Sequence, residues 1–248
     1  MASLPLAKCC ISGVLHTGTP VGSIKTIGKT QAYLSYPKDS STHHAILILT
    51  DVYGYTFPNT RLIADQFAAR GYFTIIPDLF QGREVSFPAP DDFNLQTYIH
   101  NVMPRVETVD PIIRSVIEEM RNEMGVQKLG GVGYCFGGKY VCRWLKEGGL
   151  DAGFVAHPSF VDGEEVKGVK GPMSIAAAES DDIFTVEKRR ETEEILRELS
   201  VPWEMFLYSG VEHGFAVKGH MSTKRARFAK EQAFGQAVAW FEEYLKEE

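Results

Sequence analysis

Short, unbroken runs of apolar residues recur along the chain, and they constrain its fold more than any other feature. Runs of this length are typical of strands that are buried on both faces, as in a parallel sheet. We expect strands over 45–49, 72–77, 129–134, 153–156, 173–177 and 203–207.

Amphipathic segments long enough for helices lie between these runs. One of them begins after Asn59, which we expect to cap the helix, and ends at Gly71. Others cover 106–124, 139–146, 187–199 and 223–245. Strand and helix therefore alternate, which predicts an α/β fold with a mostly parallel central sheet and helices on both faces. In segment 23–36 apolar and polar residues alternate instead, with a turn at Gly28, so we expect an N-terminal antiparallel hairpin. No break in composition divides residues 1–248, which predicts a single domain.

Charge and composition exclude several classes of function. The chain has 26 Lys and Arg against 32 Asp and Glu, a net charge of −6, and this predicts no nucleic-acid partner. No apolar run reaches the ~20 residues that a bilayer requires, and the first twenty residues do not resemble a secretory signal. The four cysteines have neither disulfide-framework nor zinc-ligand spacing, so we expect free thiols, a cytoplasmic location and no metal site.

The residues around Cys135 form the strongest local motif. Gly133-Tyr-Cys135-Phe-Gly137 follows an apolar strand and opens a helix, which is the nucleophile-elbow pattern G-x-S-x-G with cysteine in place of serine. A cysteine at a helix N-terminus is favoured as a thiolate. The structural alternative is a buried cysteine on a glycine-rich turn.

The same residues partly match a phosphate-binding P-loop. Gly133 and Gly138-Lys139 have the required spacing, but Tyr140 stands where the motif requires Ser or Thr to hold magnesium. The sequence therefore favours the elbow over a nucleotide site.

A base and an acid follow Cys135 in the chain order that elbow enzymes use. His213 comes after the last predicted strand, and Asp181 and Asp182 come after the strand over 173–177. All three lie at the carboxyl edge of the expected sheet, where α/β proteins carry their sites. We expect Asp181, rather than Asp182, to orient His213. The alternatives are an ordinary loop histidine and a helix-capping pair of acids.

The combined motifs resemble the dienelactone hydrolase family of the α/β-hydrolase fold. The resemblance covers about residues 45–245 and rests on Asp51-Val-Tyr-Gly54, Pro77-Asp-Leu-Phe80, Gly133-Tyr-Cys135-Phe-Gly-Gly138, Glu179-Ser-Asp181 and His213-Gly-Phe215. Cys9-Cys10, the stretch His16-Thr-Gly-Thr-Pro20 and Ala156-His-Pro-Ser159 resemble the fungal branch of that family.

The resemblance implies a Cys-His-Asp triad that opens an ester or lactone without a cofactor. Cys135 would be the nucleophile, His213 the base and Asp181 its orienting acid. The backbone N–H groups of Val52 and Phe136 would form the oxyanion hole. The residues expected to contact the substrate are Asp51, Tyr53, Arg83, His157 and Phe215.

The chain departs from the family prototype at three positions. Asp51 replaces a glutamate that helps to activate the cysteine. Two arginines that grip the substrate carboxylate in the prototype correspond to Gly82, with Arg83 next, and to Val217, with Lys218 next. A larger or neutral ester or lactone is therefore an alternative substrate.

Two other classes of function stay open from the sequence. One is a lyase, isomerase or dehydratase of secondary metabolism that uses the same site. The other is a non-catalytic, thiol-bearing binding protein. For the hydrolase we expect a small-molecule substrate, no membrane partner, and either a monomer or a homodimer.

Overall fold

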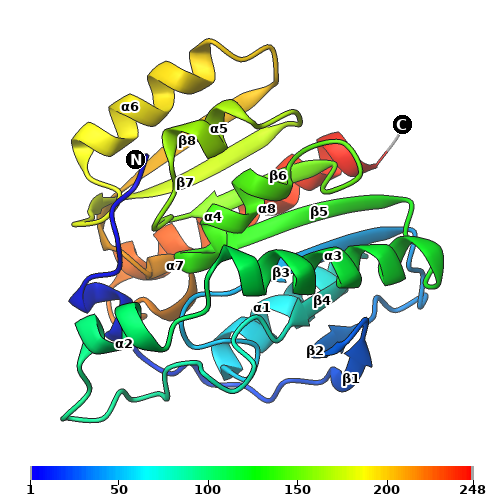
Figure 1. Ribbon diagram of the computed structural model, residues 1–248, viewed down its shortest axis with the longest axis horizontal. Coiled ribbons are helices and arrows are strands. Elements are labelled where there is room, and N and C mark those ends of the chain that lie inside the picture. Colours follow the sequence, from blue (N-terminus) through cyan, green and yellow to red (C-terminus); the bar gives the residue numbers. More distant parts are fainter. Residues whose placement is uncertain (1, 247–248) are drawn as a thin grey trace.

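The computed structural model describes residues 2–246, and its strands form one eight-stranded sheet in the order β1-β2-β4-β3-β5-β6-β7-β8 (Figure 1). The pairs from β4 through β3 to β8 are parallel, whereas β1 pairs with β2, and β2 with β4, in antiparallel fashion. The predicted parallel sheet and N-terminal hairpin are thereby confirmed. The strands are β1 (Ser23–Ile27), β2 (Thr30–Ser35), β3 (His44–Leu49), β4 (Phe73–Pro77), β5 (Lys128–Tyr134), β6 (Ala152–Ala156), β7 (Met173–Ser180) and β8 (Trp203–Glu212).

Helices cover both faces of this sheet. On one face α1 packs against α8 through Phe67 and Phe234, whose rings lie 4.8 Å apart. On the other face α3 is tied to α4 by the ion pair between Asp110 and Arg143. The helices are α1 (Pro58–Ala69), α2 (Leu95–Asn101), α3 (Val106–Asn122), α4 (Phe136–Trp144), α5 (Gly163–Lys167), α6 (Val186–Arg197), α7 (Phe215–Lys218) and α8 (Lys224–Leu245), with a 3₁₀ turn, η1 (Lys8–Ile11), before them. No helix within residues 2–246 is both long and apolar enough to span a bilayer.

The central strands are buried as their apolar runs predict, but the last strand is different. All residues of β4, and all of β3 after its first, are buried between the two helical layers. In contrast, β8 is half exposed along most of its length and extends to Glu212, five residues beyond the predicted end. It lies at the sheet edge with one strand neighbour, so the expectation of burial on both faces is wrong for this strand.

Asn59 does not cap α1 as predicted. The helix begins at Pro58, a residue well suited to a first helical position, and Phe57 occupies the cap position. The Asn59 amide instead donates to the carbonyls of Val14 and Val217, and its oxygen accepts from the backbone of His16. Asn59 therefore fastens the N-terminal part of the chain to the body of the molecule.

Residues 2–22, called here the N-terminal segment, run along the carboxyl edge of the sheet. In Figure 1 this dark blue segment passes from beside β7 down past α2 and α7 before it enters the hairpin. Backbone hydrogen bonds join Ser3 to Val161 and Val14 to Lys218. The segment is thus fixed at both ends across the edge where α/β proteins place their functional groups.

Candidate active site

Cys135 sits on a sharp turn between β5 and α4 in a backbone conformation that side-chain-bearing residues seldom adopt, with φ 51° and ψ −109°. Glycines permit this turn. A Cβ added to Gly137 would lie 1.9 Å from the Leu49 carbonyl oxygen, and one added to Gly133 would lie 2.8 Å from the Gly137 carbonyl oxygen. The strand-turn-helix context that the elbow pattern requires is therefore present, with Cys135 directly before the first residue of α4.

Asp181 and His213 form a buried pair beside this turn. His213 Nδ1 lies 3.0 Å from both carboxylate oxygens of Asp181, and both side chains are fully buried. The backbone N–H groups of Ile183 and Phe184 donate to Oδ1 of Asp181 and fix the carboxylate. The arrangement leaves Nε2 of His213 as the nitrogen available for chemistry. Asp182, the sequence alternative, is exposed.

Cys10, which the sequence analysis did not select, completes the cluster. Its Sγ lies 3.5 Å from Sγ of Cys135 and 3.5 Å from Nε2 of His213. The ligand atoms of the three residues all lie within 4.8 Å of one another. Cys10 belongs to η1 of the N-terminal segment and is fully buried. Cys9-Cys10 appeared in the sequence only as part of the resemblance to the fungal branch, and its place at the site could not be predicted because Cys10 lies 125 and 203 positions from its two neighbours.

The two thiols of this cluster differ in ionisation. Burial opposes ionisation of Cys135, but the hydrogen bond with Cys10 and the positive charges of His213 and Lys218 lower the pKa of Cys135 well below 9. Burial, together with the hydrogen bonds to Cys135 and Cys9, raises the pKa of Cys10. Burial would lower the pKa of His213, yet the Cys135 charge and the Asp181 hydrogen bond outweigh it and raise that pKa to about 10. These shifts favour the thiolate form of Cys135, the neutral thiol of Cys10 and the protonated ring of His213.

Asp51 and Lys218 add two buried groups of opposite charge. Burial raises the pKa of Asp51 to about 6, against the attraction of Lys218. One Asp51 oxygen accepts from the Tyr53 backbone, while the other has no hydrogen-bond partner among the described residues. Lys218 is only 2% exposed, and its ammonium donates to the Cys9 carbonyl. In the sequence Lys218 stands out only as the neighbour of Val217, a position that does not match the family, because nothing in its local pattern indicates burial.

The remaining predicted site residues divide into two groups. His157, Phe215 and Tyr53 are buried near the cluster, and the His157 ring meets His213 edge-on at 4.9 Å and Phe215 at 5.8 Å. Neither ring nitrogen of His157 has a hydrogen-bond partner among the described residues. Arg83, in contrast, is exposed, and its guanidinium contacts the Phe80 carbonyl and the Gln81 side chain. The structure does not bring Arg83 into contact with the buried cluster in the described part of the chain.

The two backbone N–H groups predicted to form an oxyanion hole have no acceptor among the described residues. Within residues 2–246, neither the N–H of Val52 nor that of Phe136 donates a hydrogen bond. Val52 follows the end of β3, and Phe136 is the first residue of α4, so the positive end of that helix adds to its donor strength.

Lys139, the lysine of the P-loop alternative, is already engaged. Its ammonium donates to the Phe160 carbonyl and pairs with Glu165 at 2.7 Å and Asp162 at 3.4 Å. Lys139 therefore has a structural role in joining α4 to α5, which argues against the hypothesis of a nucleotide site.

A cavity of about 240 Å³ adjoins the cluster. Ser12 and Gly13 of the N-terminal segment form one side, and His213, Phe215 and Lys218 contribute to the rest. Its volume is below the roughly 300–1,000 Å³ of pockets for drug-sized ligands, so it suits a small molecule.

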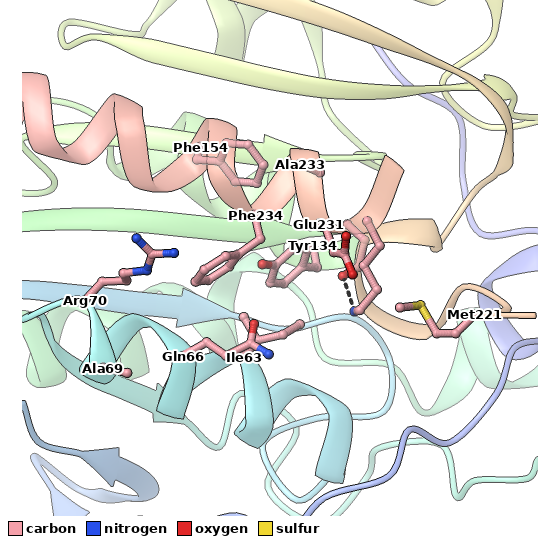
Figure 2. Close-up of a pocket in the computed structure, with 12 residues that line it drawn as sticks. Ile63, Gln66, Ala69, Arg70, Tyr134, Phe154, Met221, Glu231, Ala233 and Phe234 are labelled. Carbon is pink, nitrogen blue, oxygen red and sulfur yellow. Dashed lines mark hydrogen bonds between the residues drawn. The ribbon is translucent and has the colours of Figure 1, made fainter. Parts of the chain in front are cut away.

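A larger cavity of about 440 Å³ lies elsewhere, between α1 and α8 (Figure 2). Ile63 and Gln66 of α1 face Phe234 of α8 across it, and Tyr134 reaches it from β5. Cys135, His213 and Asp181 do not line it. His213 lines the smaller cavity, so we take that cavity as the one next to the candidate site.

Comparison with known proteins identifies the family of the chain. The model of the dienelactone hydrolase family matches residues 30–245. The chain is 48% identical to a protein named hydrolase pyvD from Aspergillus violaceofuscus, over 99% of this chain and 100% of that protein. It is 49% identical to hydrolase tropI from Talaromyces stipitatus, with 100% of both covered. Among solved structures, one of a dienelactone hydrolase from Klebsiella pneumoniae superposes with a TM-score of 0.73 at 17% identity, over 90% of this chain and 99% of that one. This likeness shows the expected α/β-hydrolase fold.

Proposed function

This chain is a hydrolase of the dienelactone hydrolase family, and we propose that it opens a small ester or lactone through a Cys135-His213-Asp181 triad without a cofactor. One observation carries the proposal. The strained elbow at Cys135 and the buried Asp181-His213 pair meet at one edge of the sheet, although they come from three separate segments.

The first step is attack of the Cys135 thiolate on the substrate carbonyl. The lowered pKa of Cys135 supports this role, because the thiolate is the nucleophilic form. The oxyanion that forms would accept hydrogen bonds from the backbone N–H groups of Val52 and Phe136. Donors that are already oriented stabilise this charge without having to reorganise.

His213 would then move the protons. Its Nε2 donates to the leaving alkoxide or enolate, and the neutral ring subsequently takes a proton from the water that hydrolyses the acyl-cysteine. Asp181 binds Nδ1 and keeps Nε2 directed toward the reacting atoms. The geometry thus supports both halves of an acyl-transfer cycle.

The surroundings favour a compact substrate. Phe215 lines the cavity, and Tyr53 and His157 are buried rings next to Lys218 and His213 respectively. Asp51 directly precedes Val52 in the chain. Lys218, rather than the exposed Arg83, is the cation close enough to interact electrostatically with Cys135 and Asp51. We therefore propose that Lys218 takes the place of the prototype's arginines toward a negatively charged substrate group.

The test is intact-mass spectrometry after incubation with p-nitrophenyl acetate. We expect the wild type to gain one acetyl group and to release nitrophenol, whereas Cys135→Ala should do neither. Cys142→Ala, which removes a buried thiol elsewhere on α4, is the matched control and should acetylate as the wild type does. Acetylation that persists in Cys135→Ala would disprove the assignment of the nucleophile.

A further inference from the structure

Three groups with a preference for soft metal ions meet at the candidate active site. The two thiol sulfurs lie 3.5 Å apart, and the Cys10 sulfur lies 3.5 Å from Nε2 of His213. All three residues are buried, with exposed fractions of 0% for Cys10, 1% for Cys135 and 6% for His213. The hydrolytic cycle described above uses Cys135 and His213, whereas Cys10 contributes only through its hydrogen bond with Cys135.

We propose that Cys10, Cys135 and His213 together bind one Zn²⁺ ion, and that this ion inhibits the enzyme by occupying its nucleophile and its base. Zinc favours thiolate and imidazole ligands, and sites with two cysteines and one histidine leave a fourth position for water. The binding site stands on its own geometry, whereas the inhibition rests on the proposed function.

Two of the three distances are close to the edges of one face of a zinc tetrahedron. With Zn–S near 2.3 Å and Zn–N near 2.0–2.1 Å, ideal tetrahedral edges are about 3.8 Å between two sulfurs and about 3.6 Å between sulfur and nitrogen. The observed separations are 3.5 Å in both cases, and the third edge is within 4.8 Å. Shifts of a few tenths of an ångström, plus closure of the third edge, would therefore complete the site.

The groups behind the three ligands also fit a metal site. Asp181 binds Nδ1 of His213 through both oxygens at 3.0 Å, which is the carboxylate-histidine arrangement that commonly orients zinc ligands. Backbone N–H groups of Ile183 and Phe184 hold Asp181 in turn. His213 would thus present Nε2 to the ion without changing its ring orientation.

The N-terminal segment holds Cys10 in position, and neighbouring elements hold the segment. The Lys218 ammonium donates to the carbonyl of the preceding residue, Cys9, and the Cys10 N–H donates to the Ala7 carbonyl. Asn59 and the backbone of Lys218 both bind Val14 a few residues further on. Little conformational freedom would therefore be lost when the ion binds.

The charges balance at the bound site. Two thiolates and a neutral imidazole around Zn²⁺ have no net charge, which suits a buried position. Binding displaces two protons from the three groups, since both cysteines ligate as thiolates and the histidine as a neutral ring.

Equilibrium dialysis with ZnCl₂, in a phosphine reductant that keeps the thiols reduced, measures the binding. We expect one zinc per wild-type chain and an affinity at least ~100-fold weaker in Cys10→Ala and Cys10→Ser. Cys9→Ala is the matched control, because it removes the adjacent, half-buried thiol, and it should bind as the wild type does. Equal affinity in wild type and both Cys10 variants, or an equal loss in Cys9→Ala, would overturn the proposal.

Cobalt gives a second measurement that is independent of activity. Co²⁺ in the wild type should show the absorption of a tetrahedral ion and thiolate-to-cobalt charge transfer, and both should weaken in Cys10→Ala. A spectrum typical of octahedral cobalt in the wild type would overturn the proposed ligand set.

Inhibition is measured last, as the rate with zinc divided by the same variant's rate without it. Zinc should inhibit the wild type reversibly, with recovery on addition of EDTA, and the inhibitory concentration should rise at least ~100-fold in Cys10→Ala. Zinc binding without any esterase activity would refute the proposed function but support the metal site. Esterase activity without zinc binding would support the proposed function but refute the metal site.

Discussion

The Cys10 sulfur lies 3.5 Å from Nε2 of His213, so the reactive nitrogen of the proposed base faces a thiol of the N-terminal segment. The same sulfur lies 3.5 Å from Cys135. A hydrogen bond to the Cys135 thiolate stabilises its charge and lowers the pKa of the nucleophile. The resting site is therefore an ionic pair that a third, neutral group helps to stabilise.

Replacing Asp181 by Asn should lower kcat by about 10³–10⁴-fold and leave KM nearly unchanged. The amide would favour the wrong tautomer of His213, as loss of the acid does in other triads. Steady-state hydrolysis of p-nitrophenyl acetate provides the measurement. Asp182→Asn changes the exposed neighbour and should retain wild-type kcat. Similar kcat values for the two variants would contradict the assigned role of Asp181.

Alkylation should distinguish Cys135 from Cys142. The two side chains are buried to nearly the same extent, at 1% and 3% exposure, so ionisation decides between them. Burial raises the pKa of Cys142 to about 12, whereas the pKa of Cys135 is well below 9. At pH 7 iodoacetamide should therefore modify Cys135 about 100-fold faster or more, as followed by peptide mapping. Equal rates would show that Cys135 is not an activated thiolate.

Asp51→Asn should stabilise the protein at neutral pH. Burial raises the pKa of Asp51 to about 6, so between pH 4 and 6 the folded state binds more protons than the unfolded state. Stability from this group is consequently lost as pH rises through that window, by an amount on the order of 1–3 kcal/mol. Urea unfolding of both proteins should show a gain in Asp51→Asn at pH 7.5 and almost none at pH 4. A gain that does not depend on pH would exclude this explanation.

Gly137→Ala should destabilise the fold by more than about 3 kcal/mol. The new Cβ would lie 1.9 Å from the Leu49 carbonyl oxygen, and both groups belong to the backbone, so relieving the clash requires a backbone shift. Gly235→Ala is a matched control on α8, where a Cβ meets nothing within 4 Å. It should stabilise the protein by up to about 1 kcal/mol, because alanine is the better helix residue. Thermal unfolding compares the two. A small effect at Gly137 would mean that the elbow tolerates a side chain.

The sequence predicted well those features that local patterns determine. The apolar runs at β3 and β4 marked buried strands, and the glycine spacing around Cys135 marked a tight strand-to-helix turn. The order of Asp181 and His213 in the chain also predicted that these two residues pair, because the loops that follow parallel strands lie at the same edge of the sheet.

Contacts between distant segments could not be predicted in the same way. Nothing around Cys10 indicates that it lies beside a residue 125 positions away. Asparagine often caps helices, yet the Asn59 amide donates hydrogen bonds to the carbonyls of Val14 and Val217 instead. The end of β8 was misjudged because an edge strand with an exposed face lacks the continuous apolar run of a buried one.

The N-terminal segment has a consequence for how relatives of this protein diversify. The matched family region begins at residue 30, whereas Cys10, Ser12 and Gly13, which border the site, come before it. Backbone hydrogen bonds at Ser3 and Val14 hold its path, and the buried side chains of Ala2, Leu6 and Cys10 anchor it in the core. Its exposed side chains are therefore the ones that can change. Grafting the segment between relatives should therefore alter two things together: which molecules reach the site, through Ser12 and Gly13, and the ionisation of Cys135, through Cys10.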